Sequence, residues 1–137
     1  MVQFYFLAIC LNLIGGLVLA APYFQDRFPM ISRLRETLYS KTSLRIGLIS
    51  SLLVVGILKI ISVFIGDVII VGDLLPVLAL LTSGFTLLVE YISEGNEAEK
   101  GFIIKMDSIF VKHSSIVGVA AIVIGVLHFI FPSVLFL

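Results

Sequence analysis

Apolar positions in this chain gather into four long runs instead of alternating with polar ones. The runs cover about residues 2–24, 43–64, 68–92 and 114–137, and each holds few or no charged residues. A hydrocarbon layer about 30 Å thick is crossed by roughly 20 apolar residues in helical conformation. The pattern therefore predicts an all-α polytopic integral membrane protein, in which residues 1–137 form a single transmembrane domain with four transmembrane helices.

Polar and helix-ending residues separate these runs. The first run ends at residues 25–27, which precede Pro29, the second at Gly66-Asp67 and the third at residues 93–97. Tyrosines lie near several of the ends, as expected for rings in the headgroup layer. The short connection between the second and third runs, residues 66–76, contains two Gly-Asp pairs and a proline. It predicts a tight hairpin or a short re-entrant turn.

The two longer connections have helical patterns of their own. Apolar residues repeat at helical spacing in each, with basic residues between them: Ile31, Leu34 and Leu38 in the first, Phe102, Met106 and Ile109 in the second. This predicts amphipathic interfacial helices at about 28–41 and 100–112. The residues expected to contact lipid headgroups are Arg33, Arg35, Lys41, Lys105 and Lys112. A docking surface for a partner protein is the alternative.

Charge distribution predicts the orientation. Nine Lys and Arg balance nine Asp and Glu, and eight of the nine basic residues lie in or beside the two longer connections. The positive-inside rule then places these connections in the cytoplasm and both termini outside, in a bacterial-type inner or plasma membrane. The neutral balance excludes nucleic acid as a partner. A content of 60% hydrophobic and 13% charged residues, with a mean hydropathy of +1.21, excludes a soluble protein.

A weak internal repeat relates the two halves of the chain. A shift of 69 residues superposes Gly15 on Gly84 and Gly56 on Gly125 without a gap. It also superposes Lys59 on His128. The alternatives are chance similarity between apolar sequences and duplication of a two-span unit. Duplication would make the bundle two parallel two-helix repeats related by an axis along the membrane normal.

Four polar residues inside the runs form the candidate binding site. With a rise of about 1.5 Å per residue, the outer half of the bilayer contains all four: Asn12, Lys59, Asp73 and His128. A charge in the membrane needs a partner, an exit or a function. Lys59 and Asp73 face each other across a short turn and are expected to form an ion pair that His128 extends. Such a group would bind a small ion or relay protons, whereas structural polar packing is the alternative. Glu90, at the cytoplasmic end of the third run, is expected to be solvated at the interface.

Small residues occur on every run and predict close helix packing, within the bundle or between copies. The glycines assigned to packing are Gly15, Gly16, Gly56, Gly84, Gly118 and Gly125. On the second run, Gly47 stands near Ser50 and Ser51 and belongs to the same class of small-residue face.

No catalytic motif is recognisable, so no enzyme activity, cofactor or metal site is predicted. One cysteine and two histidines 15 residues apart do not make a metal-ligand pattern. The sequence favours a small multi-pass membrane protein that is a non-catalytic subunit or assembly partner of a larger membrane complex. The alternative is a homo-oligomeric small-ion or proton-coupled transporter or channel that uses the outer-half polar residues. The expected partners are membrane lipids and either other membrane subunits or further copies of the chain.

Overall fold

The computed structural model describes residues 2–65, 74–95 and 101–131, and it is all-helical over these ranges. The described residues form six helices: α1 (Val2–Phe24), α2 (Pro29–Ser40), α3 (Thr42–Ile65), α4 (Leu74–Gly95), α5 (Gly101–Phe110) and α6 (Ser114–Ile130). The prediction of an all-α fold is confirmed. Helices were also expected in the two longer connections, and α2 and α5 lie there.

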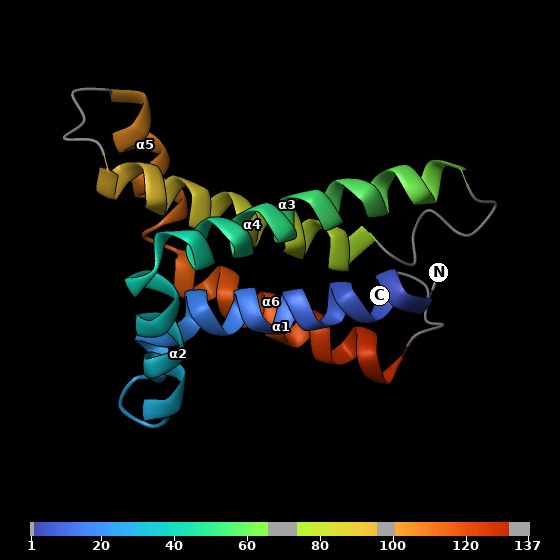
Figure 1. Cartoon of the computed structure of the whole chain (residues 1–137), viewed down its shortest axis with the longest axis horizontal. Coiled ribbons are helices and arrows are strands. Elements are labelled where there is room, and N and C mark those ends of the chain that lie inside the picture. The colour runs from blue at the N-terminus through green and yellow to red at the C-terminus, as the bar shows by residue number, and fades with distance from the viewer. Residues whose placement is uncertain (1, 66–73, 96–100, 132–137) are drawn as a thin grey trace.

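The four long helices form a bundle with α2 and α5 at one end (Figure 1). The start of α1 and the end of α6 lie at the opposite end. Helices α1 and α4 run toward the α2 end, whereas α3 and α6 run away from it. The most extensive contacts are between α1 and α6 and between α3 and α4, and α4 also packs on both α1 and α6.

Three helices are long and apolar enough to cross a membrane, over Phe4–Phe24, Thr42–Ile61 and Leu74–Gly95. A fourth span would combine Ile104–Phe110 with Ser114–Ile130, which meet at a bend of 47°. The described part of the chain therefore has three or four candidate spans, which is compatible with a membrane location. The turn expected at residues 66–76 falls mostly outside the described residues, and so does the start of the third predicted run.

The core lies between α1, α3 and α4, where long aliphatic side chains interlock. Its buried members are Ala8, Leu11, Val18, Leu19, Ile49, Leu52, Val55, Leu80 and Leu87. Helix α6 joins the bundle differently, through small residues such as Gly118, Ala121 and Gly125, while Ile116 and Phe129 are more than 60% exposed. Apolar side chains on the outside of a bundle are compatible with a membrane location.

The closest helix crossing is between α1 and α6. A Cβ atom added to Gly118 would lie 2.5 Å from the backbone N of Ala20 and 2.6 Å from the backbone O of Gly16. Because both neighbours are backbone atoms, no side chain can move aside, and only glycine fits here. The predicted close packing of Gly16 and Gly118 is thus a contact between two backbones.

The other packing glycines face side chains instead. Gly15 and Gly84 lie against leucines of α3, and Gly56 lies against Leu81 of α4. Gly125 lies against Asn12 and Leu13 of α1. Each glycine makes room for a large side chain from the neighbouring helix.

Helix α2 begins at Pro29, a residue favoured in the first turn because its missing N–H would have had no partner there. Its apolar stripe covers the end of the core, since Leu34 and Leu38 pack against the buried cluster. The stripe therefore contacts the bundle, while Arg33 and Glu36 point outward and are exposed.

Candidate functional site

Polar side chains gather at both ends of the bundle. We call the group at the α2 end the Glu90 cluster; it consists of Arg35, Tyr39, Arg45, Glu90, Tyr91 and Glu94. The group at the other end we call the Tyr5 cluster; it consists of Tyr5, Lys59 and His128.

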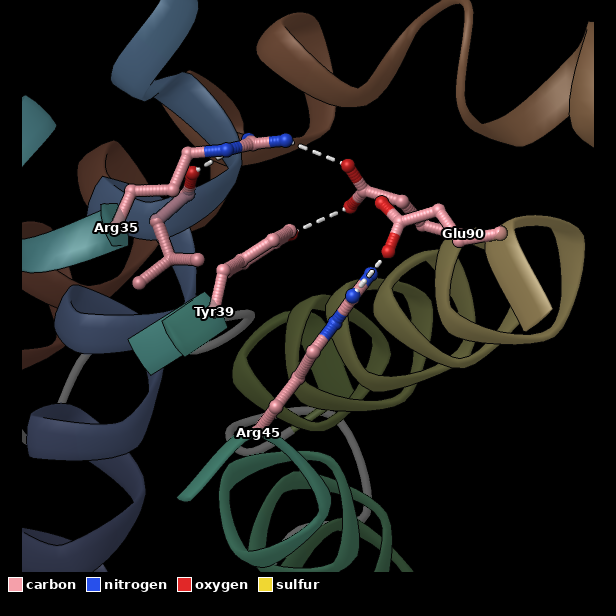
Figure 2. Close-up of polar contacts among 6 residues, drawn as sticks. Arg35, Tyr39, Arg45 and Glu90 are labelled. Atoms are coloured by element: carbon pink, nitrogen blue, oxygen red, sulfur yellow. Dashed lines mark hydrogen bonds and ion pairs between the residues drawn. The ribbon is translucent and has the colours of Figure 1, made fainter. Parts of the chain in front are cut away.

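Glu90 is the centre of the first cluster. It sits near the end of α4, is 7% exposed, and accepts hydrogen bonds from two residues of α2. The Arg35 guanidinium donates to its Oε1 at 2.5 Å and the Tyr39 hydroxyl donates to its Oε2 at 2.6 Å (Figure 2). Arg35 also donates to the backbone O of Val18 in α1 at 3.0 Å. These bonds fix α2 to both α4 and α1.

Arg45 extends the cluster from the start of α3. Its guanidinium is paired with Glu94 of α4 and stacks over the Tyr39 ring, with 4.0 Å from Cζ to the ring centroid. The Cζ atom of Arg45 also lies over the Tyr91 ring, 5.3 Å from its centroid. A cation against aromatic faces in a desolvated place is favourable by about 2 kcal/mol. Arg45 thus connects α2, α3 and α4.

Tyr39 is held in its neutral form by this environment. Burial raises the pKa of the Tyr39 phenol above its ordinary value, and the adjacent Glu90 carboxylate raises it further, while Arg35 and Arg45 oppose the shift. A protonated phenol is what the geometry needs, because the hydroxyl must donate to Glu90.

The expectation that Glu90 is solvated at the interface is wrong. Its carboxylate is buried because α2 folds back over the end of α4 and supplies two donors. Sequence reasoning missed the Glu90 cluster. The available signal was a carboxylate inside an apolar run together with an amphipathic helix carrying arginine, since a buried carboxylate requires such a partner.

The Tyr5 cluster brings together two of the predicted site residues. The Tyr5 hydroxyl donates to the backbone O of His128, and the two rings pack with centroids 4.6 Å apart. The Lys59 ammonium lies 5.9 Å from the centroid of the same Tyr5 ring. Lys59 and His128 are both buried, with 6% and 1% exposure. Helices α3 and α6 and the N-terminal turns of α1 thus meet around the Tyr5 ring.

Asn12 and Asp73, the other two candidates, have different outcomes. Asn12 is fully buried and donates from Nδ2 to the backbone O of Pro76 in α4 at 3.1 Å. Its Oδ1 has no hydrogen-bond partner among the described residues. Asp73 lies outside the described residues, so the ion pair expected between it and Lys59 remains a prediction.

The five residues expected to contact lipid headgroups also have different outcomes. Arg35 turns inward to Glu90. The other four have exposed side chains, and for them headgroup contact stays a prediction: Arg33, Lys41, Lys105 and Lys112. Within the described parts of the chain, no three of the His, Cys, Asp and Glu side chains lie close enough to hold a metal ion.

These features define a helical bundle with several helices of membrane-spanning length and polar groups turned inward at both ends. A family model for a domain of unknown function matches residues 1–128, and the chain belongs to that family. The matched region takes in α1 to α5 and α6 as far as His128. No curated protein and no solved structure matches the chain.

Proposed function

We propose that the protein is a non-catalytic subunit or assembly partner of a larger membrane complex. In this proposal α1, α3 and α4 span the membrane, and so does the α6 part of the bent α5–α6 pair. Both termini face outside, and α2 and α5 lie at the cytoplasmic surface. The proposed role is structural: the bundle offers one face to the transmembrane helices of a partner.

The observation that carries this proposal is the exposed small-residue face of α3. Only 33% of its apolar stretch is buried within the bundle, against 56% for α1 and for α4. Its outer face has small residues at a spacing of four, Ser43, Gly47 and Ser51, and all three are exposed. A Cβ atom added to Gly47 would meet nothing within 4 Å. The face is therefore open to a neighbour.

The chain itself illustrates what such a face can do. Small residues let helix backbones approach closely, and in a membrane this packing, more than hydrophobicity, drives helix association. Gly16 and Gly118 make that kind of contact inside the bundle. We infer that Gly47 and its neighbours make it with a helix of another subunit.

The distribution of charge supports a non-catalytic role. Both ion pairs found among the described residues, Arg35 with Glu90 and Arg45 with Glu94, join helices to one another. The middle of the bundle is filled by fully buried leucines. These four charged groups are thus committed to holding the fold together.

Packing also supports the duplication of a two-span unit. A shift of 69 residues exchanges the two main helix pairs, because it maps α1 onto α4 and α3 onto α6. The contact between Gly56 and Leu81 then corresponds to a contact between Gly125 and Asn12, and both are present. In this proposal α1 to α3 and α4 to α6 descend from one unit.

The experiment is extraction of the tagged chain from its native membrane in a mild detergent, followed by mass measurement and identification of the proteins that come with it. The proposal expects a hetero-complex of defined composition. A chain that is recovered alone, or as a closed ring of identical copies, would contradict it.

The Tyr5 cluster favours a second candidate, a homo-oligomeric small-ion or proton-coupled transporter or channel. Lys59 and His128 are buried cationic and titratable groups at corresponding places of the two halves, and such groups in spans commonly belong to ion pathways. This candidate predicts ion flux in liposomes that Lys59→Met abolishes. The subunit proposal predicts no flux from either protein.

A further inference from the structure

A shallow groove lies on the outside of the bundle where α3, α4 and α5 meet. Its volume is about 310 Å³, and the residues that line it are Leu53, Leu81, Thr82, Phe85 and Phe110. Phe110 of α5 packs edge-on against Phe85 of α4, with ring centroids 5.0 Å apart, and forms the wall at the α5 side. Almost the whole lining is hydrocarbon.

The groove exists because the two halves of the bundle differ here. On the 69-residue shift, Leu53 of α3 corresponds to Ile122 of α6. The lining residues of α4, which are Leu81, Thr82 and Phe85, correspond in that order to Asn12, Leu13 and Gly16 of α1. At that corresponding place α1 and α6 touch, since a Cβ on Gly16 would lie 2.7 Å from the backbone O of Gly118 and 2.8 Å from Ile122. Phe85 stands where the first half has Gly16, so a bulky ring lies beside the groove at the place where α1 and α6 touch through their backbones.

We propose that this groove binds one acyl chain of an anionic phospholipid, with the headgroup against the lysines of α5. The proposal rests on the membrane placement proposed above. Phe85 lies five residues before Glu90, about 7.5 Å along the helix axis, so the groove begins just below the level of the Glu90 cluster. An acyl chain descending from the headgroup layer would pass along it.

Charge supports a lipid of this class. Lys105 and Lys112 are exposed on and just after α5, the helix that supplies Phe110. Asp107 also lies on α5 and is half-buried, so the exposed charge there is basic. A phosphate with a net negative headgroup would be held by the two lysines, whereas a zwitterionic headgroup would gain less. The groove is shallow, and its apolar lining suits a flexible hydrocarbon chain.

The test measures lipid bound to the purified full chain by native mass spectrometry, after incubation with phosphatidylglycerol or phosphatidylcholine. Wild type is expected to retain one phosphatidylglycerol and to prefer it over phosphatidylcholine. Thr82→Trp fills the groove and is expected to weaken retention by at least about tenfold, which is 1.4 kcal/mol. The matched control is Leu78→Trp, one turn away on α4 and 48% exposed outside the groove, and it should bind as wild type does.

A second variant leaves the packing untouched. Lys105→Gln with Lys112→Gln should remove the preference for phosphatidylglycerol, and it decides the question if Thr82→Trp does not fold. Unchanged retention in Thr82→Trp, equal loss in Leu78→Trp or an unchanged preference in the lysine variant would overturn the proposal. A change in oligomeric mass caused by Thr82→Trp would also overturn the proposal, because it would show that the groove holds a helix of another subunit. Lipid occupancy is measured on the isolated chain, so it fails or succeeds separately from the search for partner subunits.

Discussion

Helices α2 and α5 occupy corresponding places in the two halves of the bundle, each packed on the first long helix of its half. The chemistry that holds them is different. Helix α2 is tied down by a buried carboxylate, two arginines and a tyrosine. Helix α5 is held by an aromatic contact beside a groove.

None of the polar residues of the Glu90 cluster is repeated in the other half. On the 69-residue shift Arg35 corresponds to Ile104, Tyr39 to Ser108 and Glu90 to Ala21. The helix arrangement is therefore shared by the two halves, while the polar anchor belongs to one of them. We expect α2 to behave as a fixed part of the bundle and α5 as the more easily detached helix.

The largest effect is expected where the two helix pairs differ most. Gly118→Ala should destabilise the bundle by about 3 kcal/mol, because the added methyl meets the backbones of Gly16 and Ala20. Gly56→Ala, at a glycine of the α3–α4 pair that faces a side chain, should cost about 1 kcal/mol or less, since Leu81 can move aside. Equilibrium unfolding in mixed micelles, followed by circular dichroism, measures both. Equal losses would show that the two pairs pack alike.

The second-largest effect tests whether α2 is anchored separately from α5. Glu90→Gln should cost about 2 kcal/mol, below the cost of breaking a fully buried pair because Arg35 is partly exposed. Glu94→Gln should cost about 1 kcal/mol, because the Glu94 side chain is 52% exposed although Arg45, which loses its counter-charge, is only 7% exposed. Hydrogen exchange should speed up in α2 and stay unchanged in α5 for Glu90→Gln. Faster exchange in both helices would contradict separate anchoring.

Tyr39 gives the α2 anchor a dependence on pH. Because burial and Glu90 raise the pKa of the phenol in the folded state, its contribution is complete below the unfolded value of 10.0 and is lost as the pH rises beyond that value. Tyr39→Phe should cost about 1 kcal/mol at neutral pH. The difference in stability between wild type and Tyr39→Phe should then shrink above pH 10, as measured by unfolding across that range. A difference that stays constant to high pH would mean that Tyr39 is not held neutral by Glu90.

The smallest effect concerns the anchor of α5. Phe110→Leu should cost about 0.5 to 1 kcal/mol, the share that an edge-on aromatic pair adds beyond its buried area. Exchange protection should fall in Gly101–Phe110 and remain in α2. If α2 loosens as well, the two helices are coupled through α4 and the contrast between them fails.

Much of this fold follows from the spacing of apolar residues. The first two runs coincide with α1 and α3 to within one residue at each end, because long apolar stretches allow few alternatives. Gly16 and Gly118 were assigned to packing faces from the sequence, but which helices meet there was not predicted. Which small residues touch backbone and which touch leucines depends on the crossing geometry, and no pattern along one helix contains it.

The candidate site was predicted in part for a similar reason. Lys59 and His128 were grouped by depth and by the internal repeat, and they do meet at Tyr5. Glu90 was misplaced because its partners, Arg35 and Tyr39, are more than 50 residues away in sequence. Their meeting depends on how α2 turns back over the bundle, which is tertiary structure.

The most direct test of the central proposal, that α3 offers its outer face to another subunit, is the mass of the complex extracted with Gly47→Leu. The matched control is Ala120→Leu, the same kind of change at an exposed small residue of α6. We predict that Gly47→Leu leaves the isolated bundle folded but releases it from its partners, while Ala120→Leu keeps the wild-type mass. A Gly47→Leu complex with the mass and composition of wild type would contradict the proposal.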